Sequence, residues 1–490
     1  MTGRTGGVLR HRVALFAASL LLLAAVPGTN WTGAPVDPAL ASGGYALVRV
    51  GHGAAGAVAG EAQASGATEV AALEAIDVVT ARVTEQTIRA LRSDARVAFI
   101  AADTTVTALG YGSGFEKGTE KPSPGIKVVS AQRAWSKATG RGVTVALMDT
   151  GVARHPDLDG SVVTQIDFVG DGATQLDPSG HGTFVAGLIA AHGASFKGVA
   201  PDAKLVSLRV LDQKGQGTMH SVLAAFDWLL HNRSAYHIRV LNLSFGAKQT
   251  TSYHRSLLSG VVESAWFAGI GVVAAAGNDG PAPRTVSMPG ADPFVITVGS
   301  LADQGTPGWG DDRESVFSSR GPTRDGFAKP DVLAPGEHIV SLRVPGTALD
   351  GYGQSTNTSL YARLTGTSAS SAMATGVAAL VLQAHTGYSP TQVKGALVAG
   401  GRNVAGTRTP AVNALDALTA RPAPANAGVA PSAVLIKVLV ASGQIAGSVN
   451  WDGIAWEGIA WESVTWEGIT WEAVSWESVT WESVTWEARS

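Results

Sequence analysis

Short apolar segments alternate with helix-like segments from Val143 to Val398, and this alternation constrains the fold more than any other feature of the sequence. The strand-like runs are Val143–Met148, Leu205–Val210, Val240–Leu243, Val272–Ala275, Val295–Val298 and Val332–Leu333. The helix-like runs are Phe184–Ala191, Ser221–His231, Arg255–Phe267, Ser370–Thr386 and Pro390–Val398. Such a pattern predicts an α/β fold, a doubly wound parallel sheet flanked by helices. Ligands of these sheets bind at the carboxyl ends of the strands, so reactive side chains are expected there.

The composition narrows the chemistry that such a sheet can carry. The chain has no cysteine, which excludes disulfides, thiolate metal sites and a thiol nucleophile. Its net charge of −3 does not support nucleic-acid binding. Hydrophobic residues make up 45% of the chain and charged residues 15%, as in proteins that form a packed core.

Three motifs lie where predicted strands end or predicted helices begin. Asp149 directly follows a strand-like run, whereas His181 and Ser368 each open a helix-like segment. An acid, an imidazole and a hydroxyl form a nucleophilic triad when the histidine takes the serine proton and the carboxylate stabilises the histidine cation. A serine at a helix N-terminus also lies at the positive end of the helix dipole.

The residues around these motifs resemble the subtilisin family of serine endopeptidases, the subtilases, in which the triad residues follow in the order Asp, His, Ser. Four segments carry the resemblance, which extends over about residues 43 to 420: Val145–Val152 with His155–Leu158, Ser179–Gly187, Lys329–Gly336 and Gly366–Ser368. The resemblance implies a serine endopeptidase acting on polypeptides, with residues 112–420 as its catalytic domain. It also implies that the Asn278 amide and the Ser368 backbone N–H stabilise the oxyanion of the tetrahedral intermediate.

The same resemblance suggests where an extended substrate would lie. Ser244, Phe245 and Gly246 resemble one edge of the substrate cleft, and the Gly215–Gly217 segment resembles the opposite edge, so a peptide between them would pair as an added strand. Leu211 and Phe245 would wall an apolar pocket upstream of the cut. Ala275, Ala276 and Gly277 would form one wall of the pocket beside the cut, with Ser287 near its base and Asp279 near its rim. We expect this pocket to accept apolar side chains of medium size, and Asp279 to admit Lys or Arg.

The N-terminus reads as an export signal. Arg4, Arg10 and Arg12 precede an apolar run, Val13–Val26, that is too short to span a bilayer and suits a signal peptide within residues 1–41. Ala39–Ala41 is one candidate cleavage site and a site nearer Pro27 is another; an uncleaved anchor is the alternative. The expected location is therefore extracellular or associated with the cell wall.

Residues 42–111 resemble the inhibitor-type propeptide of subtilisin-like proteases, with β-α-β-β-α-β order. The expected elements are a strand at Tyr45–Val50, a weak helix at Ala67–Leu73, a strand at Ile76–Val83, a helix at Glu85–Arg92 capped by Thr84 and a strand from Val97 to Ile100. The propeptide would act as the enzyme's own inhibitor and be cut off between about Thr104 and Lys127.

Several positions depart from the family pattern or carry no chemistry. Ala372 replaces the usual Pro, which a helix tolerates. Asp157 matches a frequent calcium ligand, but its usual loop partners are missing, so we predict no metal site, and catalysis requires no cofactor. His155 is expected to be structural, and Asp177 and Asp331 are expected to be loop or capping acids. Residues between Pro345 and Leu364 would form a surface loop near the active site.

The C-terminal part differs in composition from the rest. Residues 421–450 are predicted to be a linker and a short strand, and residues 451–490 repeat Trp, acid, small, Ile/Val, small with a period of five. This period fits neither a helix nor a plain strand, which leaves a turning solenoid or a bulged strand. The repeat is either an adhesive module for the cell wall, a glycan or a protein, or a tail that packs on its own domain. Its acidic side chains exclude nucleic acid.

The sequence therefore predicts a secreted serine endopeptidase that processes itself from a preproprotein. The alternative is a catalytically silent, subtilase-shaped binding or scaffold protein of the cell envelope, against which the intact set Asp149, His181, Asn278 and Ser368 argues. A membrane-anchored processing protease is a third hypothesis, but such enzymes usually have a C-terminal membrane span, where this chain has the Trp repeat.

Overall fold

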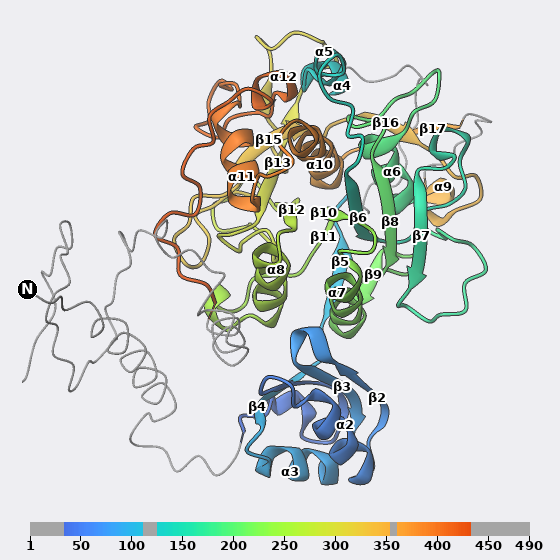
Figure 1. The fold of residues 1–490 in the computed structure, drawn as a ribbon, viewed down its shortest axis with the longest axis vertical. Coiled ribbons are helices and arrows are strands. Elements are labelled where there is room, and N and C mark those ends of the chain that lie inside the picture. The colour runs from blue at the N-terminus through green and yellow to red at the C-terminus, as the bar shows by residue number, and fades with distance from the viewer. Residues whose placement is uncertain (1–33, 111–124, 353–359, 433–490) are drawn as a thin grey trace, which may run out of the picture.

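The computed structural model describes residues 34–110, 125–352 and 360–432, which form a small α+β unit and a larger α/β domain (Figure 1). Residues 1–33 of the proposed signal peptide, the connector from 111 to 124 and the Trp repeat lie outside the described residues. No helix among the described residues is long and apolar enough to cross a membrane.

The small unit is a four-stranded antiparallel sheet, in the order β2-β3-β1-β4, with two helices. Thr84 caps the second helix, because its Oγ1 accepts a hydrogen bond from the Thr87 N–H at 3.2 Å. The β-α-β-β-α-β order agrees with the sequence pattern. The elements are β1 (Gly44–Val50), α2 (Ala55–Ala64), β2 (Thr68–Leu73), β3 (Val78–Val83), α3 (Glu85–Ser93) and β4 (Val97–Ala102).

The helix predicted at Ala67–Leu73 was wrong. This segment is strand β2, which pairs with β3, and the helix lies earlier, at α2. The buried residues of α2 are Ala55, Val58, Ala59 and Ala62. Because three of these four side chains are alanine methyl groups, α2 shows little amphipathic contrast and its period is hard to recognise in the sequence.

The larger domain is built on an eight-stranded sheet, and the predicted α/β fold is confirmed. Seven strands run parallel in the order β15-β13-β12-β10-β6-β8-β7, and β14 pairs antiparallel with β13. The prediction missed β7, whose side chains are only partly buried because it lies at the edge of the sheet. The strands are β6 (Thr144–Asp149), β7 (Val162–Asp167), β8 (Lys204–Arg209), β10 (Ile238–Leu243), β12 (Gly271–Ala275), β13 (Ile296–Ala302), β14 (Arg313–Glu314) and β15 (Val332–Pro335).

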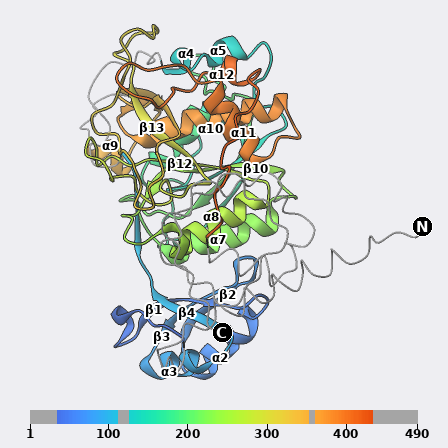
Figure 2. The ribbon, with the colours of Figure 1, turned by 90° about the vertical axis from the view of Figure 1, so that its left-hand side faces the viewer.

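Helices cover both faces of this sheet. On one face α6 (His181–Ala190) packs against α10 (Thr367–Ala384), and α11 (Pro390–Ala399) lies beside α10; α7 (Met219–Asn232) and α8 (Leu257–Phe267) cover the other face (Figure 2). Every residue of α10 from Thr367 to Leu382 is buried. Shorter elements complete the domain: α4 (Gly125–Val128), α5 (Ala131–Ala134), α12 (Ala414–Ala417), α9 (Ala348–Tyr352) and the antiparallel pair β16 (Ile339–Leu342) and β17 (Tyr361–Leu364).

The small unit lies against α7, and the chain that follows its last strand, β4, continues into the larger domain (Figure 1). Ala75 N–H donates to Asp227 Oδ1 at 2.7 Å, and His220 Nδ1 lies 2.6 Å from Asp103 Oδ2. Beyond Asp103 the chain forms β5 (Thr105–Ala108), which lies between β9 (Gln216–Thr218) and β11 (Phe245–Gly246) in a separate three-stranded antiparallel sheet.

Residues 421–432 lie along the larger domain. Asn426 Oδ1 accepts a hydrogen bond from Lys394 Nζ at 2.9 Å, and the Tyr253 hydroxyl donates to the Ala430 carbonyl at 2.8 Å. At the end of the segment, Ser432 N–H and Oγ donate to the buried carboxyl group of Glu263 at 2.6–3.0 Å. This part of the predicted linker is therefore hydrogen-bonded to α8 and α11.

Candidate active site

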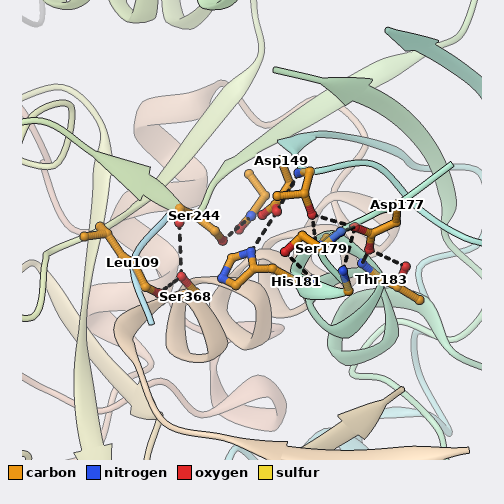
Figure 3. A network of polar contacts seen from close by, with 12 residues as sticks. Leu109, Asp149, Asp177, Ser179, His181, Thr183, Ser244 and Ser368 are labelled. Atoms are coloured by element: carbon orange, nitrogen blue, oxygen red, sulfur yellow. Dashed lines mark hydrogen bonds and ion pairs between the residues drawn. The ribbon is translucent and has the colours of Figure 1, made fainter. Parts of the chain in front are cut away.

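The three triad candidates lie at element ends that the fold brings to one place. Asp149 is the last residue of the central strand β6, His181 is the first residue of α6, and Ser368 is the second residue of α10. All three are at most 1% exposed. In Figure 3 the His181 ring lies between Asp149 on one side and Ser368 on the other.

Asp149 and His181 form a close, buried ion pair. His181 Nδ1 lies 2.7 Å from Asp149 Oδ1, which also accepts a hydrogen bond from the Thr150 N–H at 2.7 Å. When Nδ1 carries a hydrogen and donates it to Asp149, Nε2 is the ring nitrogen that can accept a proton. The Asp149–His181 pair therefore has the geometry of a carboxylate that orients a general base.

The environment of His181 favours its protonated form. Burial, the largest single effect, opposes the imidazolium, but the charge and hydrogen bond of Asp149 together with Asp177 and the Leu109 carbonyl outweigh it. The net effect raises the pKa of His181 above its ordinary value of 6.5. A histidine of this kind holds a proton taken from a nucleophile more firmly than a solvated one.

Asp177 connects the two motifs. Its Oδ2 accepts hydrogen bonds from the Thr183 N–H at 2.8 Å and from Thr183 Oγ1 at 2.6 Å, so it caps α6. Its Oδ1 accepts from Thr150 Oγ1 at 2.8 Å, and the Gly182 N–H in turn donates to that threonine oxygen. Burial raises the pKa of Asp177 despite these hydrogen bonds. The network holds the strand end that carries Asp149 against the helix start that carries His181.

Two motif glycines allow this close approach. Gly151 has φ +108°, and a β-carbon there would collide with the Leu176 carbonyl. A β-carbon on Gly182 would collide with the Gly151 carbonyl. Both positions need glycine because backbone lies against backbone where β6 and α6 meet.

Ser368 faces a peptide bond of the same chain. Its Oγ contacts the carbonyl oxygen of Leu109, one residue beyond β5, and lies 3.0 Å from the Ser244 carbonyl oxygen (Figure 3). The Leu109 N–H donates to the same Ser244 carbonyl at 2.9 Å. The next residue, Gly110, lies against Thr365 and Gly366. The peptide bond between Leu109 and Gly110 thus lies directly at the nucleophile candidate.

Asn278 is oriented by Thr367. Its Oδ1 accepts hydrogen bonds from the Thr367 N–H at 3.0 Å and from Thr367 Oγ1 at 2.9 Å. Since a backbone N–H can only donate, the amide oxygen faces Thr367 and the amide NH₂ points the other way. No role was predicted for Thr367 from the sequence, although it directly precedes the nucleophile candidate.

The predicted substrate edges lie on both sides of β5. Phe245 and Gly246 pair with Ala108 and Thr107, and Gly217 pairs with Val106 on the other side. The Ala108 N–H donates to the Gly215 carbonyl at 2.8 Å. The burial pattern of β5 alternates: Val106 and Ala108 are buried, whereas Thr105 and Thr107 are exposed.

A glycine lies beside each of two apolar side chains of this segment, Leu109 and Val106. A β-carbon on Gly246 would lie 3.2 Å from Leu109 Cδ1 and 2.6 Å from Ser287 Oγ. A β-carbon on Gly217 would lie 3.3 Å from Val106 Cγ2 and 2.8 Å from Leu211 Cδ2. Leu109 thus lies beside Gly246, and Val106 lies near Leu211.

The other predicted wall residues lie at and after the end of β12. Ala275 ends β12 and pairs with Val298, and the Ala276 N–H donates to the Val298 carbonyl at 2.9 Å. A β-carbon on Gly277 would lie 3.0 Å from Ser287 Oγ, and Asp279 is exposed.

The remaining candidates have structural contacts. His155 Nδ1 accepts a hydrogen bond from the Asp157 N–H, and Asp157 Oδ2 accepts one from the Tyr361 hydroxyl at 2.7 Å. Asp331 pairs with Lys329 and Lys394. Near the His motif, the Ala348 N–H donates to the Pro178 carbonyl. Within the described residues no group of three or more His, Asp or Glu side chains could hold a metal ion.

Comparisons with known proteins agree on one family. The family model described as the subtilase family, Peptidase S8, matches residues 140–411. Serine protease AprX of Bacillus subtilis is 40% identical over 266 residues, which cover 52% of this chain and 60% of that protein. M-protease of Shouchella clausii is 33% identical over 325 residues, covering 66% of this chain and 73% of that protein.

A solved structure shows the same fold at lower identity. Fervidolysin from Fervidobacterium pennivorans, described as a keratinolytic enzyme related to subtilisin, superposes with a TM-score of 0.61 at 23% identity. The match covers 82% of this chain and 65% of the fervidolysin chain.

Proposed function

The chain belongs to the subtilase family of serine proteases, and from this premise we propose that it is a secreted serine endopeptidase that cuts its own precursor between Leu109 and Gly110. The observation that carries the proposal is the contact between Ser368 Oγ and the Leu109 carbonyl. A folded chain places only a few peptide bonds next to a buried serine, and this one also follows a strand paired on both sides.

The proposed reaction is acyl transfer. Ser368 Oγ attacks the Leu109 carbonyl carbon while His181 Nε2 takes the hydroxyl proton, and Asp149 stabilises the resulting imidazolium. The oxyanion accepts hydrogen bonds from the Asn278 NH₂ and the Ser368 N–H, and one such donor lowers the barrier by about 2.7–4 kcal/mol. His181 then donates its proton to the Gly110 nitrogen, which leaves, and water releases the acyl group by the same steps.

The small unit would then serve as an inhibitor. After the cut, Val106–Leu109 would remain paired with Gly217 and Phe245, and the unit would still contact α7 through Ala75 and Asp103. Other polypeptides would bind in the same cleft, with an apolar residue of medium size in the place of Leu109. The cleavage falls within the window from Thr104 to Lys127 that the sequence suggested.

Export is part of the proposal. Ala34 and Leu40 are buried in the core of the small unit, and the Asp37 N–H donates to the Ile100 carbonyl at 2.9 Å. Cleavage after Ala41 would remove these contacts. The packing therefore supports signal-peptide removal nearer Pro27.

N-terminal sequencing of the purified protein tests the proposed cut. The wild-type chain should yield a mature form that begins at Gly110, and Ser368→Ala should remain one uncut chain. Asp159→Ala, an exposed residue outside the site, is the control and should be processed like the wild type. Processing of purified Ser368→Ala, or a mature chain that begins elsewhere, would contradict the assigned bond. A wild-type chain that does not react with a fluorophosphonate would favour the silent scaffold.

A further inference from the structure

Behind the nucleophile candidate, four buried polar side chains form a continuous hydrogen-bonded chain. Thr375 Oγ1 lies 2.9 Å from Asn242 Oδ1, and Asn242 Nδ2 lies 2.8 Å from Ser244 Oγ. Ser244 Oγ lies 3.0 Å from Ser371 Oγ, whose hydroxyl reaches the Ser368 carbonyl at 2.9 Å. Every member of the chain is 0% exposed.

Chemistry fixes the donors on both sides of Asn242, and the two serine hydroxyls can then be arranged in one direction. The Thr375 hydroxyl must donate to Asn242, because a carbonyl oxygen only accepts, and the Asn242 amide NH₂ must donate to Ser244. The Ser244 hydroxyl can then donate to Ser371, and Ser371 donates to the Ser368 carbonyl. Each hydroxyl thus uses its one proton within the chain, which begins at Thr375 and ends at the backbone of Ser368.

This chain of hydrogen bonds connects two elements that meet at the site, α10 and β10. Ser368, Ser371 and Thr375 follow at helical spacing on one face of α10, and Asn242 and Ser244 lie at the carboxyl end of β10. The packing of α10 on the sheet is otherwise largely apolar. Burying polar groups there costs free energy unless they are paired, so the chain holds α10 and β10 in one relative position.

We propose that Thr375 is a positioning residue for catalysis, acting through Asn242 and Ser244. The Ser244 carbonyl receives the Leu109 N–H at 2.9 Å and lies 3.0 Å from Ser368 Oγ, so it sets the distance between the bound peptide and the nucleophile. Thr375 fixes the Asn242 amide, and Asn242 fixes Ser244. This role rests on the proposed peptidase function, since it needs a substrate strand beside Ser244.

Thr375→Val keeps the shape of the side chain and removes its hydroxyl, leaving Asn242 Oδ1 buried without its donor. We expect kcat for a chromogenic anilide with the sequence of Val106–Leu109 to fall about tenfold, because small misplacements of reacting atoms are costly. KM should change less than about twofold, because the backbone pairing partners remain. Thr375→Ser retains the hydroxyl and should restore most of kcat.

Thr297→Val is the matched control, since Thr297 Oγ1 is equally buried and donates to the Gly290 carbonyl at 2.6 Å. It should lower the melting temperature about as much as Thr375→Val while leaving kcat near the wild-type value. An unchanged kcat in Thr375→Val, an equal loss in Thr375→Ser, or an equal loss in Thr297→Val would overturn the positioning role.

Asn242→Leu removes the amide that connects Thr375 to Ser244 and provides the test if Thr375→Val does not fold; a wild-type kcat in this variant would overturn the proposal. The two proposals fail in different ways. A wild-type enzyme without activity refutes the peptidase function, whereas an active wild type with an equally active Thr375→Val refutes only the role of Thr375.

Discussion

At the scale of single residues, the site depends on the side chains that hold the three triad candidates as much as on the candidates themselves. Asp177 connects Thr150 to the start of α6, and Thr367 turns the Asn278 amide. The sequence motifs identify Asp149, His181 and Ser368, because each lies in a characteristic local string. Thr150 and Thr367 lie within these strings, but the strings do not show what they contact, since a capping acid or a helix-terminal threonine is common in proteins of any function.

The raised pKa of His181 predicts the pH dependence of the enzyme. The base must be neutral to accept the Ser368 proton, so kcat/KM should rise with pH as His181 loses its proton, with a midpoint above the ordinary 6.5. Asp149→Asn removes the charge that raises this pKa, so the midpoint should fall, and kcat should drop by about 10⁴-fold. Peptide hydrolysis from pH 5 to 9 measures both effects. A midpoint that does not move in Asp149→Asn would argue against His181 as the base.

At the scale of elements, the ends of strands and helices place the site residues. Asp149 ends β6 and His181 begins α6, and the sequence indicated both elements at nearly these residues. Strand β5 and its place between β9 and β11 were not predicted; the family resemblance implied only that an extended peptide would pair with these two edges. Such short strands carry too few residues for a periodic signal, and their pairing depends on elements more than a hundred residues away in sequence.

The alternating burial of β5 predicts a difference between its two faces. Val106→Asp would place a charge in the apolar surroundings of Leu211 and should slow self-processing by at least about tenfold, because the strand would no longer seat beside the nucleophile. Thr107→Asp carries the same charge on the exposed face of the same strand and should process at close to the wild-type rate. Time courses of precursor loss on gels compare the two. Equal rates in both variants would show that β5 does not direct the cut.

At the scale of the whole molecule, residues 421–432 tie the C-terminal part of the chain to α8 and α11. The Ser432 N–H and hydroxyl donate hydrogen bonds to the Glu263 carboxyl group, and burial raises the pKa of Glu263 well above its ordinary value. Near it, burial raises the pKa of Asp292 to about 6. Removing Ser432 would therefore leave two interacting acids buried with fewer donors.

Two truncations of the Ser368→Ala chain test this contribution to stability. A chain that ends at Ala420 should lose about 1–3 kcal/mol of unfolding free energy, the usual cost of leaving buried polar groups unpaired. A chain that ends at Ser432 keeps the contacts and serves as the control. Denaturant unfolding, followed by tryptophan fluorescence or circular dichroism, gives both values. Equal stability of the two chains would mean that residues 421–432 contribute nothing.

The sequence by itself determined the fold class, the positions of the triad candidates at element ends and most strands and helices of the larger domain. These features depend on short-range preferences: apolar runs, helix caps and glycines in tight turns. Only the tertiary structure decided which distant residues meet, such as Thr375 with Asn242, Glu263 with Ser432 and Leu109 with Ser368. Such contacts depend on the register and packing of whole elements, whose free energy is shared over many residues and leaves no local pattern. The function of the Trp repeat stays a prediction of the sequence alone.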